Sequence, residues 1–295
     1  MNRSDHRELP AGRNVSGRAD NLTLRVASAA VLVSIGLAST YLGGWLFRAV
    51  CAIGAGGILW EWTALIARRG EPRVLVPGAA ALLAAVILAG LDLPAGAFAA
   101  IAAGAVLAMF VVAALPTGET ASAPAMWAAG GVIYAGASLL GPVLLRGDPQ
   151  WGLTALLFLF ATVWATDIFA FFCGRAIGGP ALWPLVSPNK TWSGAIGGLI
   201  GGVAAGVAVA YTIGIGKLGM IGAMALVLSV LAQAGDLLES AIKRRFGAKD
   251  ASHLIPGHGG LMDRLDGFLV AAFAALLIGV LRQGTGAPAR GFLVW

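Results

Sequence analysis

The chain has 295 residues, of which 58% are hydrophobic and 12% are charged, and its mean hydropathy is +0.84. This composition excludes a soluble globular domain, because too little polar surface would remain to face water. The formal net charge of +6 does not indicate nucleic-acid binding, since Lys and Arg also orient membrane proteins and contact anionic lipids. The sequence therefore predicts an integral membrane protein whose partner is the lipid bilayer.

The N-terminal segment, residues 1–25, is polar and carries five arginines among Ser, Asn, Gly and Asp. It predicts a disordered cytoplasmic tail. A secretory signal peptide is the alternative interpretation, but the leader is long and no clear small-residue cleavage site closes the first apolar run.

The rest of the chain contains about nine apolar stretches of the length that crosses a bilayer as a helix. Their approximate limits are 26–43, 45–66, 74–91, 95–115, 126–145, 151–173, 194–215, 218–240 and 267–282. We therefore expect an all-α, polytopic membrane protein. About five helices form an N-terminal region, 26–150, and the others form a catalytic region, 151–295, with cytoplasmic loops 174–193 and 241–266.

The orientation follows from the basic residues of the connections. With the N-terminus inside, fifteen Lys and Arg residues lie on the inner side and four on the outer side, while Arg48 lies within a predicted helix. This predicts a multi-pass protein of the cell (inner) membrane with a cytoplasmic N-terminus and an active site at the cytoplasmic face.

The second predicted helix contains Glu61 in the segment Leu59 to Trp62. An ionisable group within a membrane helix is costly unless it has a partner or faces a cavity. Two interpretations stay open: a structural pair with Arg48, or a role toward the substrate.

The connection before the seventh predicted helix carries a first polar block. Asp167 and Arg175 precede a glycine pair, and Ser187, Lys190 and Thr191 follow it. Two hydroxyls, an ammonium and a forked guanidinium are suited to a polyphosphate or a lipid phosphate.

The second polar block runs from residue 233 to 267 and holds most of the remaining polar chemistry. Asp236, Glu239, Ser240 and Lys243 share one helical face at i, i+3, i+4 and i+7. The glycine-rich stretch around His258 can turn backbone N–H groups toward an anion. Carboxylates that can hold Mg²⁺ beside cations and a phosphate-binding loop indicate transfer of a phosphoryl or nucleotidyl group.

A simpler interpretation exists for several of these residues. Asp263 and Asp266 could be caps at the start of a helix, and the basic cluster 243–245 could be an anchor that obeys the positive-inside rule. The clustering of acids and cations at one membrane face favours a site.

The second block contains the pattern S-x-x-K-R-x₄-K-D-x₅-P-G-H-G-G-x-x-D-R-x-D, and the first contains D-x₃-F-x₂-G-R followed by S-P-N-K-T-W. Together they resemble the signature of the phosphatidate cytidylyltransferase (CDP-diacylglycerol synthase) family. That family usually has an acidic residue where this chain has Ser193. The resemblance implies conversion of CTP and phosphatidate to CDP-diacylglycerol and pyrophosphate, with Mg²⁺, a second cation and a homodimer.

The expected site residues fall into three groups. Catalytic roles are expected for Asp236, Lys243, Asp263, Arg264 and Asp266. Substrate phosphates are expected to contact Arg175, Ser187, Lys190, Thr191, Arg244, His258, Gly259 and Gly260. Metal ligation is expected for Asp167, Asp236 and Asp263.

Two other functions remain open. A CTP-dependent lipid kinase would share the metal and nucleotide contacts but release CDP. A transporter would also carry Arg48, Glu61 and Asp167 in its helices, but its charges should lie near the midplane and its halves should show repeats. The polar residues gather at one face instead, which favours an enzyme.

Overall fold

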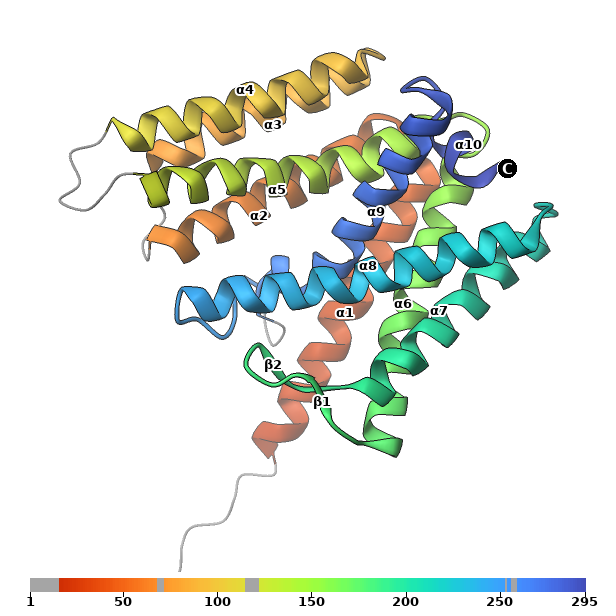
Figure 1. Cartoon of the computed structure of the whole chain (residues 1–295). Coiled ribbons are helices and arrows are strands. Elements are labelled where there is room, and N and C mark those ends of the chain that lie inside the picture. Colours follow the sequence, from red (N-terminus) through yellow and green to blue (C-terminus); the bar gives the residue numbers. More distant parts are fainter. Residues whose placement is uncertain (1–15, 68–71, 115–121, 253, 256–258) are drawn as a thin grey trace, which may run out of the picture.

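The computed structural model of the chain describes residues 16–67, 72–114, 122–252, 254–255 and 259–295. It is mostly helical (Figure 1). The helices are α1 (Ser16–Leu42), α2 (Gly44–Ala67), α3 (Pro72–Gly90), α4 (Pro94–Ala113), α5 (Ser122–Gly147), α6 (Gly152–Ile177), α7 (Trp192–Thr212), α8 (Leu218–Arg245), α9 (Met262–Gln283) and α10 (Pro288–Leu293). Two short strands, β1 (Ala181–Trp183) and β2 (Ser187–Thr191), lie between α6 and α7.

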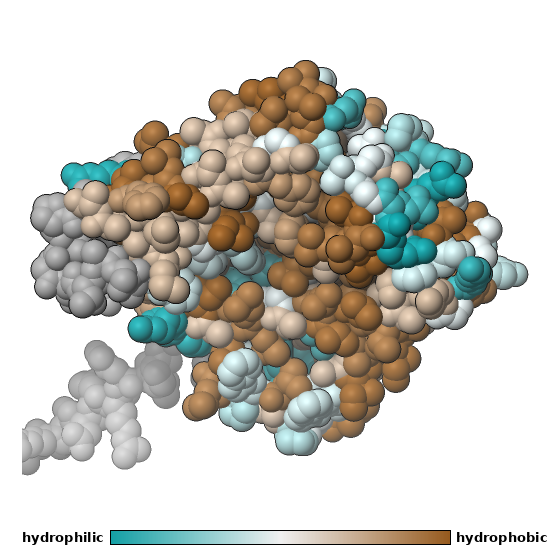
Figure 2. Space-filling model, turned by 45° about the horizontal axis from the view of Figure 1, so that its top comes forward, coloured by the Kyte–Doolittle hydropathy of each residue, from teal (hydrophilic) through white to brown (hydrophobic). Residues whose placement is uncertain are grey.

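The prediction of a polytopic all-α membrane protein is confirmed. Among the described residues, eight helices, α2 to α9, are long and apolar enough to cross a bilayer, and the apolar part of α1, Val26–Leu42, is shorter. Large hydrophobic side chains are exposed along these helices, as lipid contact requires. Figure 2 shows a mostly hydrophobic face on which hydrophilic residues gather in a few places.

The N-terminal boundary differs from the expected one. Helix α1 begins at Ser16, so residues 16–25 of the expected disordered tail are helical, and residues 1–15 lie outside the described part of the chain. A helix satisfies its backbone groups internally and can therefore continue past the apolar residues that span the membrane.

The helices form two groups with a layer between them (Figure 1). Helices α2 to α5 lie together on one side, and α6 packs along α7 on the other. Helices α8 and α9 lie between these groups, with α8 against α7 and α9 against α5. Because consecutive spans alternate in direction, the C-terminal ends of α6 and α8 meet the N-terminal ends of α7 and α9 at one side of the molecule.

A β-hairpin lies within the segment 174–193, which was predicted only as a loop. Strands β1 and β2 pair antiparallel, with Ala181 opposite Thr191 and Trp183 opposite Ser187. The turn closes with a hydrogen bond from Val186 N–H to Trp183 O, at 3.1 Å. The hairpin places the S-P-N-K-T residues in a defined, extended conformation beside the helix ends.

Glycine permits the close approach of α6 and α7 next to this hairpin. A Cβ atom added at Gly194 would lie 2.7 Å from the carbonyl oxygen of Ala170, a distance that real Cβ atoms do not reach. Small residues allow membrane helices to pack backbone against backbone. The start of α7 is thereby held against the end of α6.

Candidate active site

A cavity of about 910 Å³ opens where the ends of α6, α7, α8 and α9 meet the β-hairpin. Its walls combine acidic, basic and hydroxyl side chains with a few apolar ones. Both polar blocks of the sequence contribute to it, although more than sixty residues separate Asp167 from Asp236. The fold therefore brings the two blocks into one site.

Three carboxylates form the acidic centre of the cavity. One oxygen from each of Asp236, Glu239 and Asp266 lies within 4.8 Å of the others. Asp236 and Glu239 come from one face of α8, and Asp266 comes from the first turns of α9. Like charges this close are costly without a cation among them.

Glu239 indicates that a cation belongs there. It is 1% exposed, and its Oε1 atom has no hydrogen-bond partner among the described residues. A buried carboxylate oxygen without a partner is unfavourable, whereas a divalent metal ion would satisfy it. The three oxygen donors fit a hard cation such as Mg²⁺, which binds through a few carboxylates and retains waters for substrate phosphates to replace.

Lys243 connects the acidic centre to Asp263. Its ammonium lies 2.7 Å from Glu239 Oε2 and 2.6 Å from Asp263 Oδ1, and its side chain is only 12% exposed. Glu239 and Lys243 are four residues apart on α8, so the helix itself aligns them. A buried lysine that is held by two carboxylates has a fixed position and direction.

Asp263 also holds the loop that precedes α9. Its Oδ2 atom accepts hydrogen bonds from Gly260 N–H at 2.8 Å and from Ala251 N–H at 3.0 Å. Gly260 precedes the first residue of α9, so its bond ties the loop to the helix and does not cap an N–H group of α9. The group of three close carboxylates contains Glu239 in place of Asp263. Metal ligation by Asp263 remains a prediction.

The hairpin contributes a cation and a helix cap. Lys190 of β2 forms an ion pair with Asp236 of α8. Thr191 caps α7, because its Oγ1 accepts a hydrogen bond from Gly194 N–H at 3.1 Å. Ser193, which stands where the resembling family usually has an acid, donates a hydrogen bond to Gly178 O and so closes the connection between α6 and α7.

Most of the predicted site residues line this cavity. They are Asp167, Arg175, Ser187, Lys190, Thr191, Asp236, Lys243, Asp263, Arg264 and Asp266. Arg244 is exposed and does not line it; its guanidinium donates to Ala248 O at 3.2 Å. Gly259 and Gly260 lie against the Asp263 carboxylate and do not line the cavity, and His258 lies outside the described residues.

Four further polar residues that were not predicted as site residues line the cavity. They are Asn189, Gln233, Glu239 and Asp250. Glu239 could have been predicted from the sequence, because it lies three residues after Asp236 and therefore on the same face of the helix. The sequence offered no reason to prefer it as a ligand, because its burial depends on α9.

The structure does not pair Glu61 with Arg48. The Arg48 guanidinium lies over the ring of Trp45, with its Cζ atom 5.1 Å from the ring centroid. Glu61 is completely buried and accepts hydrogen bonds from the segment that leads into α9. The pairing was expected from proximity along the sequence, whereas the partners of Glu61 lie about 200 residues away.

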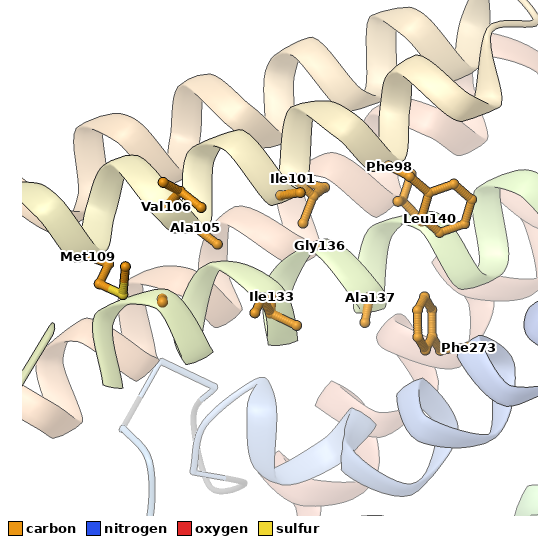
Figure 3. A pocket seen from close by; sticks show the side chains of 12 residues that line it. Phe98, Ile101, Ala105, Val106, Met109, Ile133, Gly136, Ala137, Leu140 and Phe273 are labelled. Carbon is orange, nitrogen blue, oxygen red and sulfur yellow. The ribbon is translucent and has the colours of Figure 1, made fainter. Parts of the chain in front are cut away.

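A second cavity, of about 390 Å³, lies between α4 and α5 (Figure 3). Its wall is formed by apolar side chains, among them Ile101, Met109 and Ile133, together with Phe273 of α9. Without a charged or hydrogen-bonding side chain it cannot bind phosphate or a metal ion. The polar chemistry is therefore confined to the first of these two cavities.

Comparisons with known proteins agree with this geometry. The sequence model described as the cytidylyltransferase family matches residues 23–281. A phosphatidate cytidylyltransferase of Brucella suis biovar 1 (strain 1330) is 42% identical over 275 residues, which cover 92% of this chain and 98% of the relative. One of Brucella abortus biovar 1 (strain 9-941) is 44% identical over 264 residues, covering 88% and 94%. One of Staphylococcus haemolyticus (strain JCSC1435) is 37% identical over 139 residues, covering 47% and 52%.

Proposed function

We propose, from the premise that this chain belongs to the cytidylyltransferase family, that it converts CTP and phosphatidate to CDP-diacylglycerol and pyrophosphate. It is a multi-pass membrane nucleotidyltransferase of phospholipid synthesis. The observation that carries the proposal is the polar cavity at the helix ends, where a close group of carboxylates lies beside several cations. A cavity of that chemistry can hold a metal ion and phosphates together.

The proposed metal ion is Mg²⁺, held by Asp236, Glu239 and Asp266. When bound, it would neutralise phosphate oxygens and polarise the phosphorus that is attacked. Asp167 lines the same cavity from α6 and is proposed as a further acidic contact. The expected second cation belongs to the same proposal.

The cations of the cavity are proposed to bind the phosphates. Lys190, Arg175 and Arg264 come from different elements and line one cavity. In the reaction, a phosphatidate oxygen forms a bond to the α-phosphorus of CTP, and the bond from that phosphorus to the pyrophosphate oxygen breaks. The side chains hold the two phosphates in line and stabilise the charge that develops on the leaving pyrophosphate. A phosphate monoester is already ionised near neutral pH, so no strong general base is needed.

The placement of the site suits one hydrated and one lipid substrate. The cavity lies where membrane-spanning helices end, so a lipid phosphate at headgroup level and a soluble nucleotide can both reach it. We further propose that this end of the molecule faces the cytoplasm of the cell, as the distribution of Lys and Arg predicts. The homodimer expected from the family resemblance is part of this proposal.

Product analysis with CTP labelled at either the α- or the γ-phosphorus tests the reaction. The purified protein in phosphatidate-containing micelles should transfer the α-label to lipid and release the γ-label as pyrophosphate. Transfer of the γ-label to lipid with release of CDP would instead establish a lipid kinase. The Glu239→Gln variant should lose at least ~100-fold in kcat, because it removes a charged group of the proposed metal site.

A further inference from the structure

Helix α9 carries Asp263 and Asp266, yet it begins without a cap of its own. Its N-cap residue is Leu261, whose side chain makes no capping hydrogen bond. The first N–H groups of a helix have no partner within the helix and need one from elsewhere, above all where they are buried. Met262 at the start of α9 is completely buried, so water cannot fill this role.

The missing cap comes from Glu61, in the C-terminal third of α2. Its Oε1 atom accepts a hydrogen bond from Leu261 N–H at 2.7 Å, and its Oε2 atom accepts one from Met262 N–H at 2.6 Å. The hydroxyl of Ser252 donates a third, at 2.6 Å, to Oε1. A negative charge at a helix N-terminus also interacts favourably with the helix dipole.

We propose that Glu61 is a positioning residue for the active site: it fixes the start of α9 and thereby places Asp263 and Asp266 relative to α8. Glu61 is completely buried and does not line the polar cavity, so it acts through α9 and does not touch substrate. Three hydrogen bonds offset the cost of burying its carboxylate.

The segment before α9 is held from two sides. Glu61 binds it at Ser252 and Leu261 and also binds Met262, the first residue of α9, while Asp263 binds the segment at Ala251 and Gly260. Both carboxylates lie against Gly260, where an added Cβ atom would lie 2.8 Å from Glu61 Oε1 and 3.0 Å from Asp263 Oδ2. A displacement of Glu61 is therefore transmitted to Asp263, and through Lys243 to Glu239.

Replacement of Glu61 by Gln tests the proposal. The amide keeps the shape of the side chain but turns one acceptor into a donor, which then faces a backbone N–H group. In the substrate-free protein, the affinity for Mn²⁺, measured by electron paramagnetic resonance, should fall at least ~10-fold, as expected when a group that orients metal ligands is lost. Hydrogen exchange of the peptide that covers residues 259–266 should become faster. The activity should partly recover at high Mg²⁺ concentration.

Two variants serve as controls. Thr63→Val changes another buried polar residue of α2, whose hydroxyl donates to Trp60 O in its own helix, and should leave all three measurements unchanged. Ser252→Ala removes one hydrogen bond to Glu61 but leaves both contacts to α9, and should have a smaller effect than Glu61→Gln. If Glu61→Gln is not recovered folded, Glu61→Asp, which is one methylene shorter, is measured in the same way.

Unchanged Mn²⁺ affinity and hydrogen exchange in folded Glu61→Gln protein would overturn the proposal. So would a loss of thermal stability with unaltered Mn²⁺ affinity, because that result would make Glu61 only structural. The proposal rests on the metal site of the proposed function, but its failure is distinguishable from the failure of that function. If the parent protein bound Mn²⁺ more tightly than Glu61→Gln but formed no CDP-diacylglycerol, the proposed reaction would be refuted and the positioning role of Glu61 would stand.

Discussion

Lys190 of β2 and Asp236 of α8 form an ion pair within the polar cavity. The pair joins the two polar blocks of the sequence and attaches the hairpin to the acidic centre. Both side chains remain about one-third exposed, at 30% and 37%, so solvent screens the pair and it contributes little to stability, about 0–1 kcal/mol. Its importance lies in the position of Lys190 next to a proposed metal ligand.

Replacement of Lys190 by Ala should have two opposite effects. The KM for CTP or for phosphatidate should rise by roughly 10- to 100-fold, because a charge-assisted hydrogen bond of about 1.5–3 kcal/mol is lost. The affinity for Mn²⁺ without substrate should increase slightly, by up to about fivefold, because Asp236 loses a competing cation. Steady-state kinetics and metal titration measure these effects. Unchanged KM values for both substrates would show that Lys190 does not bind substrate and that the hairpin only connects α6 to α7.

Replacement of Asp263 by Asn should lower turnover by at least ~100-fold while the protein still inserts and folds. The amide keeps the size of the side chain, but it removes the charge that holds Lys243. Activity is measured in detergent at saturating Mg²⁺, with Asp92→Asn in the turn between α3 and α4 as the control. Asp92 is exposed and has a φ of 58°, a conformation that Asn also tolerates. Activity within a few-fold of that of the parent protein would show that Asp263 has no role in the active site.

Replacement of Gly194 by Ala should destabilise the protein by about 1–3 kcal/mol, since the new methyl group would press against backbone atoms of α6. Gly219→Ala on α8 is the matched control, because its Cβ atom would meet nothing within 4 Å. That change should be neutral or stabilising by up to about 1 kcal/mol. Unfolding in mixed detergent measures both. Equal stability of the two variants would contradict the close packing of α6 on α7.

Cysteines introduced at Asn189 and Lys249, in a background with Cys51→Ala and Cys173→Ala, test the orientation. Both should react with a membrane-impermeant thiol reagent only from the cytoplasmic side, while a cysteine at Asp92 should react only from the opposite side. CTP with Mg²⁺ should slow the reaction at Asn189, which lines the cavity, but not at Lys249, which does not. Labelling of the cysteines at Asn189 and Lys249 from the outside would show that the orientation in the membrane is the reverse of the proposed one.

The sequence alone determined the helices and the chemical character of the site. Long apolar runs can cross a bilayer only as structures whose backbone groups are satisfied internally, so composition and length located α2 to α9 to within a few residues. The carboxylates and cations of the two polar blocks were visible as exceptions in an otherwise apolar chain. The spacing of Asp236 and Lys243 placed them on one helical face without any knowledge of tertiary packing.

The tertiary structure decided which of these groups meet. Glu61 could have paired with Arg48 by sequence distance, but its partners are N–H groups of Leu261 and Met262, which exist as free donors only because α9 begins there. Glu239 joins the acidic centre because α9 packs against α8 and buries it beside Asp266. Backbone donors and burial are created by packing between segments far apart in the chain, so a local pattern of residue types does not encode them.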